Sequence, residues 1–112
     1  MIKRIAVYSL PEGTDPDEFW EYHKEVHAPD IKKAYGPRLK RYVLHRITKV
    51  IDGKPSFYGF VELWCDSEED FEEGFKAHSA FKTPEGIPPH QDFLSRVTNF
   101  FMVHVDEEVI VP

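Results

Sequence analysis

The stretch from Asp15 to Ala34 constrains this chain most, because it combines a helix pattern with histidines on the side that a helix normally buries. Phe19, His23 and His27 follow one another at four-residue steps, and residues four apart lie above one another on one side of an α-helix. Three more apolar side chains widen this side into a stripe: Val26, Ile31 and Ala34. The sequence therefore predicts a helix that presents two imidazoles from its buried face.

The two ends of this helix also carry recognisable signals. Asp15 suits the capping position and Pro16 the first helical position. Pro29 disfavours helical geometry in the residue before it, so we expect a break or kink near Ala28. Gly36 then marks the stop of the helix.

Size, charge and cysteine content narrow the class of protein. A length of 112 residues predicts one domain, with 106–112 as a C-terminal tail. The net charge of −6 argues against a nucleic-acid binder, which needs a basic surplus. Cys65 has no second cysteine to pair with, and no apolar run reaches the length of a signal peptide or membrane span. We therefore expect a cytoplasmic protein that binds neither nucleic acid nor membrane.

Four strand-like runs and two further helix signals complete the chain. Residues 2–10, 38–50, 56–65 and 97–105 read as strands, a capped helix begins at Ser67, and a short helix covers 91–96. Asp52-Gly53 is a hairpin signal between the second and third strands. The order strand, helix, strand, strand, helix, strand predicts an α+β, ferredoxin-like fold with helices on one face of an antiparallel sheet.

The other face of this sheet is expected to be apolar and uncovered. Alternation places Tyr58, Phe60, Glu62 and Trp64 on one face of the third strand. Aromatic side chains such as Phe57 or Tyr58 would then face solvent in a single chain. Because a large uncovered apolar face usually meets a partner, we expect a homodimer.

Several segments resemble the EthD-type family of dimeric α+β barrel proteins. These are the helix pattern Phe19-x3-His23-x3-His27-Ala28-Pro29, the run Lys40-Arg41-Tyr42-Val43, and Val61-Glu62-Leu63-Trp64-Cys65-Asp66-Ser67. The resemblance covers roughly residues 2 to 105. It implies a homodimeric barrel, a ligand cavity between helices and sheet, and cofactor-independent chemistry on aromatic, polyketide-like or lactone compounds.

The resemblance also implies a role for one residue and marks two departures. His27 matches the helical histidine of the family and inherits its proposed acid/base role. The family usually has a bulky aromatic residue where this chain has His23, and an apolar residue where it has Asp30. Both differences predict a more polar pocket.

An imidazole both accepts and donates protons near neutral pH, so His27 and His23 are candidate catalytic residues. A core histidine bonded to a backbone carbonyl is the alternative for His23. Glu62 is a third catalytic candidate, with a pKa raised by its aromatic neighbours, or else the partner of a nearby Lys or Arg. Five more side chains are candidate substrate contacts: Tyr42, Trp64, Phe19, His78 and His90. We assign His45 and His104 to the surface or the dimer interface.

Spacing alone also admits a metal site, because His23 and His27 are four apart, as helical zinc ligands are. Lys24 stands where the zincin motif has its general-base Glu, so we expect no metal and no cofactor. Glu62 or His90 would have to supply the third ligand. Cys65 follows an aromatic strand and is expected to be buried and unreactive.

Together these features predict a cofactor-independent lyase or isomerase acting on a small aromatic, polyketide-like or lactone substrate, with His27 as the principal acid/base. Two other functions stay open: a quinol-type monooxygenase with the same barrel, and a non-catalytic binding or accessory protein of a degradation pathway.

Overall fold

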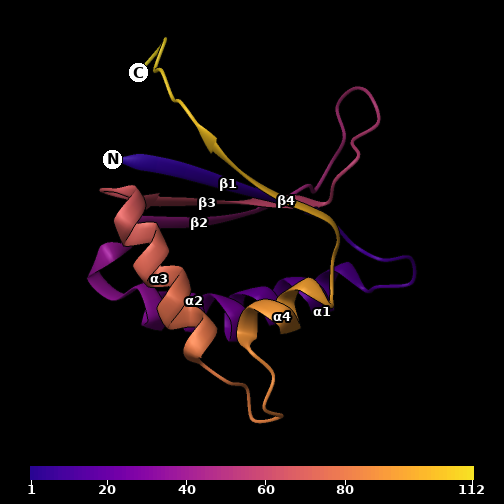
Figure 1. Ribbon diagram of the computed structural model, residues 1–112. Helices are drawn as coiled ribbons and strands as arrows, with labels where there is room; N and C mark the ends of the chain where they lie inside the picture. Colours follow the sequence, from indigo (N-terminus) through magenta and orange to yellow (C-terminus); the bar gives the residue numbers. More distant parts are fainter.

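In the computed structural model, which describes all 112 residues, every helix lies on one face of a four-stranded antiparallel sheet (Figure 1). The strands are β1 (Ile2–Ser9), β2 (Arg41–Arg46), β3 (Gly59–Cys65) and β4 (Thr98–Val105), in the spatial order β2-β3-β1-β4. The helices are α1 (Pro16–Tyr22), α2 (Ala28–Tyr35), α3 (Glu68–Ala80) and the short α4 (Pro89–Leu94). This arrangement confirms the predicted ferredoxin-like fold.

Alternation along the strands divides the sheet into an inner face, under the helices, and an outer face. Ala6 and Tyr8 of β1 and Val61 and Leu63 of β3 are buried on the inner face. Ile5 pairs with Glu62 on one side and with Val103 on the other, so these residues share the outer face. No other part of the chain covers the middle of the outer face in Figure 1.

The first helix begins as predicted. Asp15 Oδ1 accepts hydrogen bonds from the backbone N–H groups of Asp17 and Glu18, at 2.9 and 3.3 Å, and Pro16 follows the cap. These bonds satisfy two of the N–H groups that a helix start leaves free.

The helix has an irregularity close to Ala28, as expected, but it is a wider turn and not a break. Ala28 keeps helical dihedral angles, and the helix widens one turn earlier, in the π-helical turn η1 (His23–His27). The Ala28 N–H donates to the carbonyl oxygen of His23, five residues back. Pro29, which has no N–H to donate, therefore lies in the first turn of α2, and the helix continues through η1 into α2 without a break.

The apolar stripe is narrower than the sequence predicts. Ile31 and Ala34 are buried, as expected, but Val26 is 48% exposed. In the π-turn both His23 and His27 face inward, and Val26 lies on the solvent side. Gly36 ends α2 with a positive φ of 55°, which confirms the predicted stop. The 3-10 turn η2 (Gly36–Arg38) follows it.

The second strand and its turn differ from the sequence prediction. β2 covers only Arg41–Arg46, and the chain from 47 to 58 forms a long loop in place of a two-residue hairpin. The Ile47 N–H donates to Tyr58 O at 2.9 Å, which closes the base of this loop. Asp52-Gly53 therefore turns the chain within a loop, away from the strand ends, and Gly53 has a φ of +79°.

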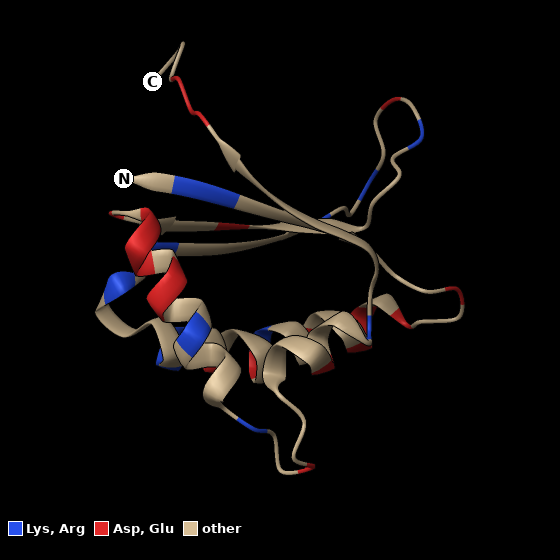
Figure 2. Ribbon diagram, viewed as in Figure 1, with Lys and Arg blue, Asp and Glu red and all other residues tan.

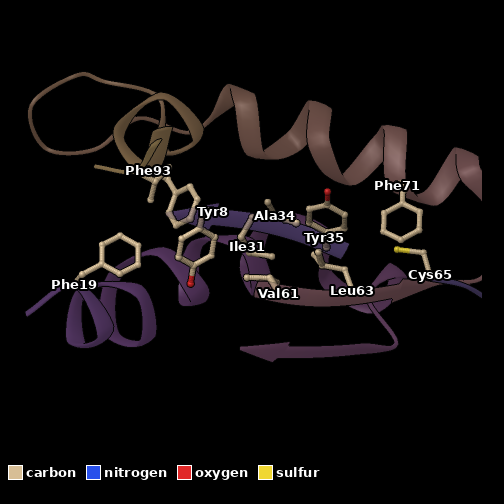
Figure 3. Close-up of a cluster of buried hydrophobic side chains, with 12 residues drawn as sticks. Tyr8, Phe19, Ile31, Ala34, Tyr35, Val61, Leu63, Cys65, Phe71 and Phe93 are labelled. Carbon is tan, nitrogen blue, oxygen red and sulfur yellow. The ribbon is translucent and has the colours of Figure 1, made fainter. Parts of the chain in front are cut away.

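The core lies between the inner face and α1, α2 and α3 (Figure 3). Ser67 Oγ accepts from the Asp70 N–H at 3.1 Å and caps α3 as predicted. In Figure 3, Phe71 projects from α3 toward Cys65, while Phe93 of α4 faces Tyr8 and Phe19 at the other end. Cys65 is fully buried, as predicted. Burial raises the pKa of its thiol to about 11, which disfavours the reactive thiolate.

The C-terminal tail has no regular structure, and Val109, Ile110 and Val111 are exposed. Figure 1 shows it leaving the end of β4 on the side of the sheet away from the helices. None of the helices combines the length and apolar character needed to cross a lipid bilayer.

Candidate active site

The π-turn brings His23 and His27 together under the inner face. Both side chains are buried, and their ring centroids lie 5.6 Å apart. His27 also stacks on Phe93 of α4, with centroids 4.3 Å apart and an interplanar angle of 22°. The predicted placement of two imidazoles on the buried side of the first helix is therefore confirmed.

A third buried imidazole joins them from α3. The His78 ring centroid lies 5.5 Å from that of His27, and His78 is as fully enclosed as His23. The sequence analysis gives His78 as a candidate substrate contact, and the structure places it in the wall of a cavity. His90, at the start of α4, lies further from His27. Its ring centroid is 6.4 Å from that of His78, and its ring lies beside those of Phe75 and Phe100.

The three histidines line one small cavity between the helices and the inner face. Its volume is about 50 Å³. Apart from the histidines and two tyrosines, Tyr35 and Tyr42, its wall is apolar. The wall residues are Ala6, His23, His27, Ile31, Tyr35, Tyr42, Val61, Leu63, Phe75, His78, Phe93, Phe100 and Met102. The cavity that the family resemblance implies is present, and it lies where expected.

The cavity is smaller than an aromatic ring needs. A volume of about 50 Å³ suits one or two water molecules, since a water takes ~30 Å³ of liquid and benzene occupies engineered cavities of ~150 Å³. Phe75 and Met102 line the cavity and are 46% and 43% exposed, so it reaches the surface between α3 and β4. A ring-sized ligand therefore requires these side chains to move.

Each of the three imidazoles has a buried nitrogen without a hydrogen-bond partner in the chain. These atoms are His23 Nε2, His27 Nδ1 and His78 Nε2. His23 Nδ1, by contrast, lies 3.1 Å from the hydroxyl oxygen of Tyr8. Since nearly all buried polar atoms in proteins are paired, three unpaired ones around one cavity need an explanation.

Burial keeps these histidines neutral. It lowers the pKa of His23 and of His78 to about 4. It lowers the pKa of His27 to about 2, with a smaller contribution from the neighbouring His23, His78 and His90. At neutral pH each ring therefore has one N–H donor and one nitrogen lone pair.

Glu62 and Trp64 do not belong to this site, because both lie on the outer face. Glu62 forms an ion pair with Lys3, and His45 Nε2 lies 3.0 Å from its Oε2, so the alternative that Glu62 pairs with a nearby Lys or Arg is confirmed. Burial acts to raise the pKa of Glu62, but hydrogen bonds from Lys3 and His45 outweigh it and hold the pKa below its ordinary value. The predicted raised pKa is wrong. Trp64 lies between the cations of Lys3 and Arg41.

Of the other residues singled out in the sequence, one lies in the cavity wall and the rest lie outside it. Tyr42 lies in the cavity wall, where the sequence analysis placed a substrate contact. Phe19 is buried behind His23, with ring centroids 5.6 Å apart, and is outside the wall. His45 stacks on Phe60 on the outer face, and His104 accepts from Arg4 Nε at the surface beside α3.

Sequence reasoning missed Tyr8 and Phe93. Tyr8 lies in the predicted strand 2–10 and Phe93 in the predicted short helix 91–96, but neither was expected at the site. Their contacts with His23 and His27 join segments far apart in the sequence, so only the hydrophobic pattern signals them.

No group of three His, Cys, Asp or Glu side chains is arranged to hold a metal ion. In particular, the proposed third ligand Glu62 lies on the opposite face of the sheet from His23 and His27.

Comparisons with known proteins agree with this fold. The sequence model of the EthD domain matches residues 11–91, well over half of the chain. An ethyl tert-butyl ether d (EthD) family protein from Bacillus halodurans C-125 is 27% identical, with a TM-score of 0.70 over 96% of this chain and 99% of that one. A dimeric ferredoxin-like protein from an uncultured marine organism is 14% identical, with a TM-score of 0.65 over 99% of this chain and 92% of that one.

SnoaB, a cofactor-independent oxygenase from Streptomyces nogalater, is 10% identical, with a TM-score of 0.61 over 98% of this chain and 97% of that one. No curated protein sequence matches the chain significantly. Because the domain model matches most of the chain, the chain belongs to the EthD family.

Proposed function

We propose that the protein is a cofactor-independent lyase or isomerase. Its substrate is a small aromatic, polyketide-like or lactone ring with oxygen substituents, and its reaction is dehydration, decarboxylation, cyclisation or lactone isomerisation. His27 is the principal acid/base and His23 its partner. The observation that carries the proposal is the set of three unpaired imidazole nitrogens around one apolar cavity.

These nitrogens cost stability, which favours a functional explanation. A buried polar atom without a partner costs ~1–3 kcal/mol. Three such atoms in one wall therefore weaken the fold unless something else binds them. Water or the oxygen atoms of a ligand would satisfy them, and the apolar remainder of the wall favours a ring.

Neutral imidazoles suit proton transfer on such a ligand. A neutral ring offers an N–H donor on one side and a lone pair on the other, so one residue accepts a proton while its neighbour donates a hydrogen bond. Negative charge that develops on the ligand raises the pKa of a neighbouring imidazole and so strengthens it as a base. The four reaction classes named above need only such steps.

The direct test is substitution of His27. With lactones and polyketide-type aromatics as substrates, His27→Ala should lower turnover at least ~10-fold, a threshold below the ~100-fold that is the smaller end of the contribution of a positioned acid/base group. His104→Ala is the matched control, because it removes an imidazole at the surface beside α3, outside both the cavity wall and the outer face. Unchanged turnover in folded His27→Ala protein would rule out this role.

A quinol-type monooxygenase is the second candidate. The same fold over nearly the whole length of SnoaB, described as a cofactor-independent oxygenase, favours it. This reaction consumes oxygen, whereas a lyase or isomerase reaction does not. An assay without oxygen, using reduced aromatic substrates, distinguishes the two: turnover that stops indicates the oxygenase, and turnover that continues excludes it.

We further propose that the working protein is a homodimer in which a second copy covers the outer face. The apolar side chains of that face support this: Ile5, Val7, Val43, Phe60, Phe101 and Val103. A fold neighbour described as dimeric adds support. Figure 2 shows a blue stretch on β1 and a red one on β3, and on the outer face Lys3 pairs with Glu62.

A further inference from the structure

The side chains of Tyr8 and His23 form an isolated pair at the inner face. Tyr8 is fully buried in β1, and its hydroxyl oxygen lies 3.1 Å from His23 Nδ1. This is the only hydrogen bond that either side chain makes in the chain, since His23 Nε2 has no partner. The rings meet edge to face, with centroids 5.7 Å apart. The pair therefore has one shared contact and two hydrogen atoms to place.

Two arrangements of these hydrogens are possible. If Nδ1 carries the proton, it donates to the Tyr8 oxygen, and both the Tyr8 hydroxyl hydrogen and the Nε2 lone pair remain unpaired. If the Tyr8 hydroxyl donates to Nδ1, the proton of His23 lies on Nε2, and this N–H is the one group left unpaired. The second arrangement leaves fewer buried polar groups unsatisfied.

The surroundings of Tyr8 agree with the second arrangement. Burial raises the pKa of the Tyr8 phenol far above neutral, so its hydrogen stays in place and must be donated. The rings around it are Phe19, Tyr58 and Phe93, and none of them provides a hydrogen-bond acceptor to the Tyr8 hydroxyl.

We propose that Tyr8 is a positioning residue that holds His23 in the tautomer with its proton on Nε2, which faces the cavity as a hydrogen-bond donor for a ligand oxygen. Nδ1 is turned toward Tyr8, which lies outside the cavity wall, so the rest of the ring forms the His23 part of that wall. The ligand part of this proposal rests on the proposed function.

This tautomer divides the work between the two helical histidines and defines the ligand more closely. His23 is a neutral donor, suited to a carbonyl or phenolate oxygen, which accepts hydrogen bonds. A neutral imidazole that polarises a carbonyl group is an established catalytic device. His27, 5.6 Å away, is then left as the base. The predicted ligand class is an apolar ring with a carbonyl or phenolate oxygen.

The tautomer is measured directly by ¹⁵N NMR of histidine-labelled protein without ligand at pH 7. Disappearance of signals in His23→Gln assigns the residue. We expect the His23 Nε2 signal to have a bonded proton and the Nδ1 signal to be that of a bare, hydrogen-bonded nitrogen. Tyr8→Phe should shift the Nδ1 signal and mix the two tautomers. Tyr58→Phe is the matched control, because it removes a phenol hydroxyl from the neighbouring ring, whose partner is Pro16 O.

A proton on Nδ1 in the natural protein, or His23 signals that are the same in Tyr8→Phe and in the natural protein, would overturn the proposal. Backbone spectra of Tyr8→Phe that match the natural protein show that the comparison is between folded states.

A second arm tests the donor role with acetophenone labelled with ¹³C at the carbonyl carbon. Hydrogen bonding from Nε2 should move the bound carbonyl signal downfield, and Tyr8→Phe should weaken binding ~5-fold, the equivalent of one ordinary hydrogen bond. If the tautomer is as expected but acetophenone does not bind, the ligand class of the proposed function is refuted and the role of Tyr8 in fixing the tautomer is supported. If acetophenone binds to both proteins equally, the donor role is refuted.

Discussion

The buried imidazoles of His23, His27 and His78 connect the fold to its sensitivity to acid. Each has a pKa lowered by burial, so the folded chain stays neutral at these sites below pH 6.5, where the unfolded chain binds protons. Because the unfolded state then binds more protons, the free energy of unfolding decreases as pH falls through this range. For His23 and His78 the decrease levels off below their folded pKa of about 4.

We therefore predict a steep loss of stability between pH 6.5 and 4. Each of these histidines contributes a slope of up to ~1.4 kcal/mol per pH unit, and the three together ~4 kcal/mol per pH unit. Urea unfolding at several pH values measures this slope, and His78→Gln should reduce it by ~1 kcal/mol per pH unit, since glutamine does not titrate there. An equal slope in the natural protein and in His78→Gln would contradict the burial of a neutral His78.

Individual residues also show the limit of sequence reasoning. Alternation along β3 correctly grouped Phe60, Glu62 and Trp64 on one face, but it does not tell which face the helices cover. Glu62 and Trp64 were therefore placed at the site although they lie on the outer face. The same alternation failed at Tyr58, just before β3, which packs against Tyr8 and Phe19 on the helix side.

Among the elements, α2 and α3 lie so close together that no side chain fits at Gly74. A Cβ atom on Gly74 of α3 would lie 2.2 to 2.6 Å from the ring atoms of Tyr35 on α2, far inside contact distance. Both residues are buried, and Tyr35 also forms part of the cavity wall. The absence of a side chain at position 74 therefore lets the two helices approach and fixes one wall of the cavity.

Gly74→Ala should destabilise the protein by ~1–3 kcal/mol, the usual cost of overpacking a core. The sign is informative, because the same change on an exposed helix face normally gains up to ~1 kcal/mol. Thermal unfolding gives the result, with a lowered Tm expected. A raised Tm would show that α2 and α3 pack less closely than described.

Most elements were predictable because their signals are local. Asp15, Ser67 and Gly36 are caps whose partners lie within a few residues, and these were confirmed. The π-turn was not predictable, because it depends on the hydrogen bond from the Ala28 N–H to His23 O, five residues back, which no local sequence pattern marks. Tyr8 joins the site only through tertiary contacts, which no local pattern encodes.

At the scale of the whole molecule, the sheet has one protected face and one apolar face without a cover. Val103 of β4 is 42% exposed on the outer face, opposite Ile5. Val26, on the solvent side of the π-turn, is 48% exposed. The two valines have similar exposure in one chain and would differ in a dimer formed through the outer face.

This difference gives a matched pair of variants. Val103→Asp should weaken the dimer at least ~10-fold, because it would place a carboxylate in an apolar interface, whereas Val26→Asp should leave association unchanged. Sedimentation equilibrium measures both dissociation constants. Equal association of Val103→Asp and the natural protein would exclude the outer face as the interface.

The proposed function requires that the cavity beside His27 receive a ring that bears oxygen. A crystal of the protein soaked with acetophenone and related aromatic carbonyl compounds shows whether it does. We expect ring-shaped electron density against His23 and His27, with Phe75 or Met102 displaced from the mouth. Unmoved side chains around a cavity that holds only water, at ligand concentrations that saturate other sites, would contradict it.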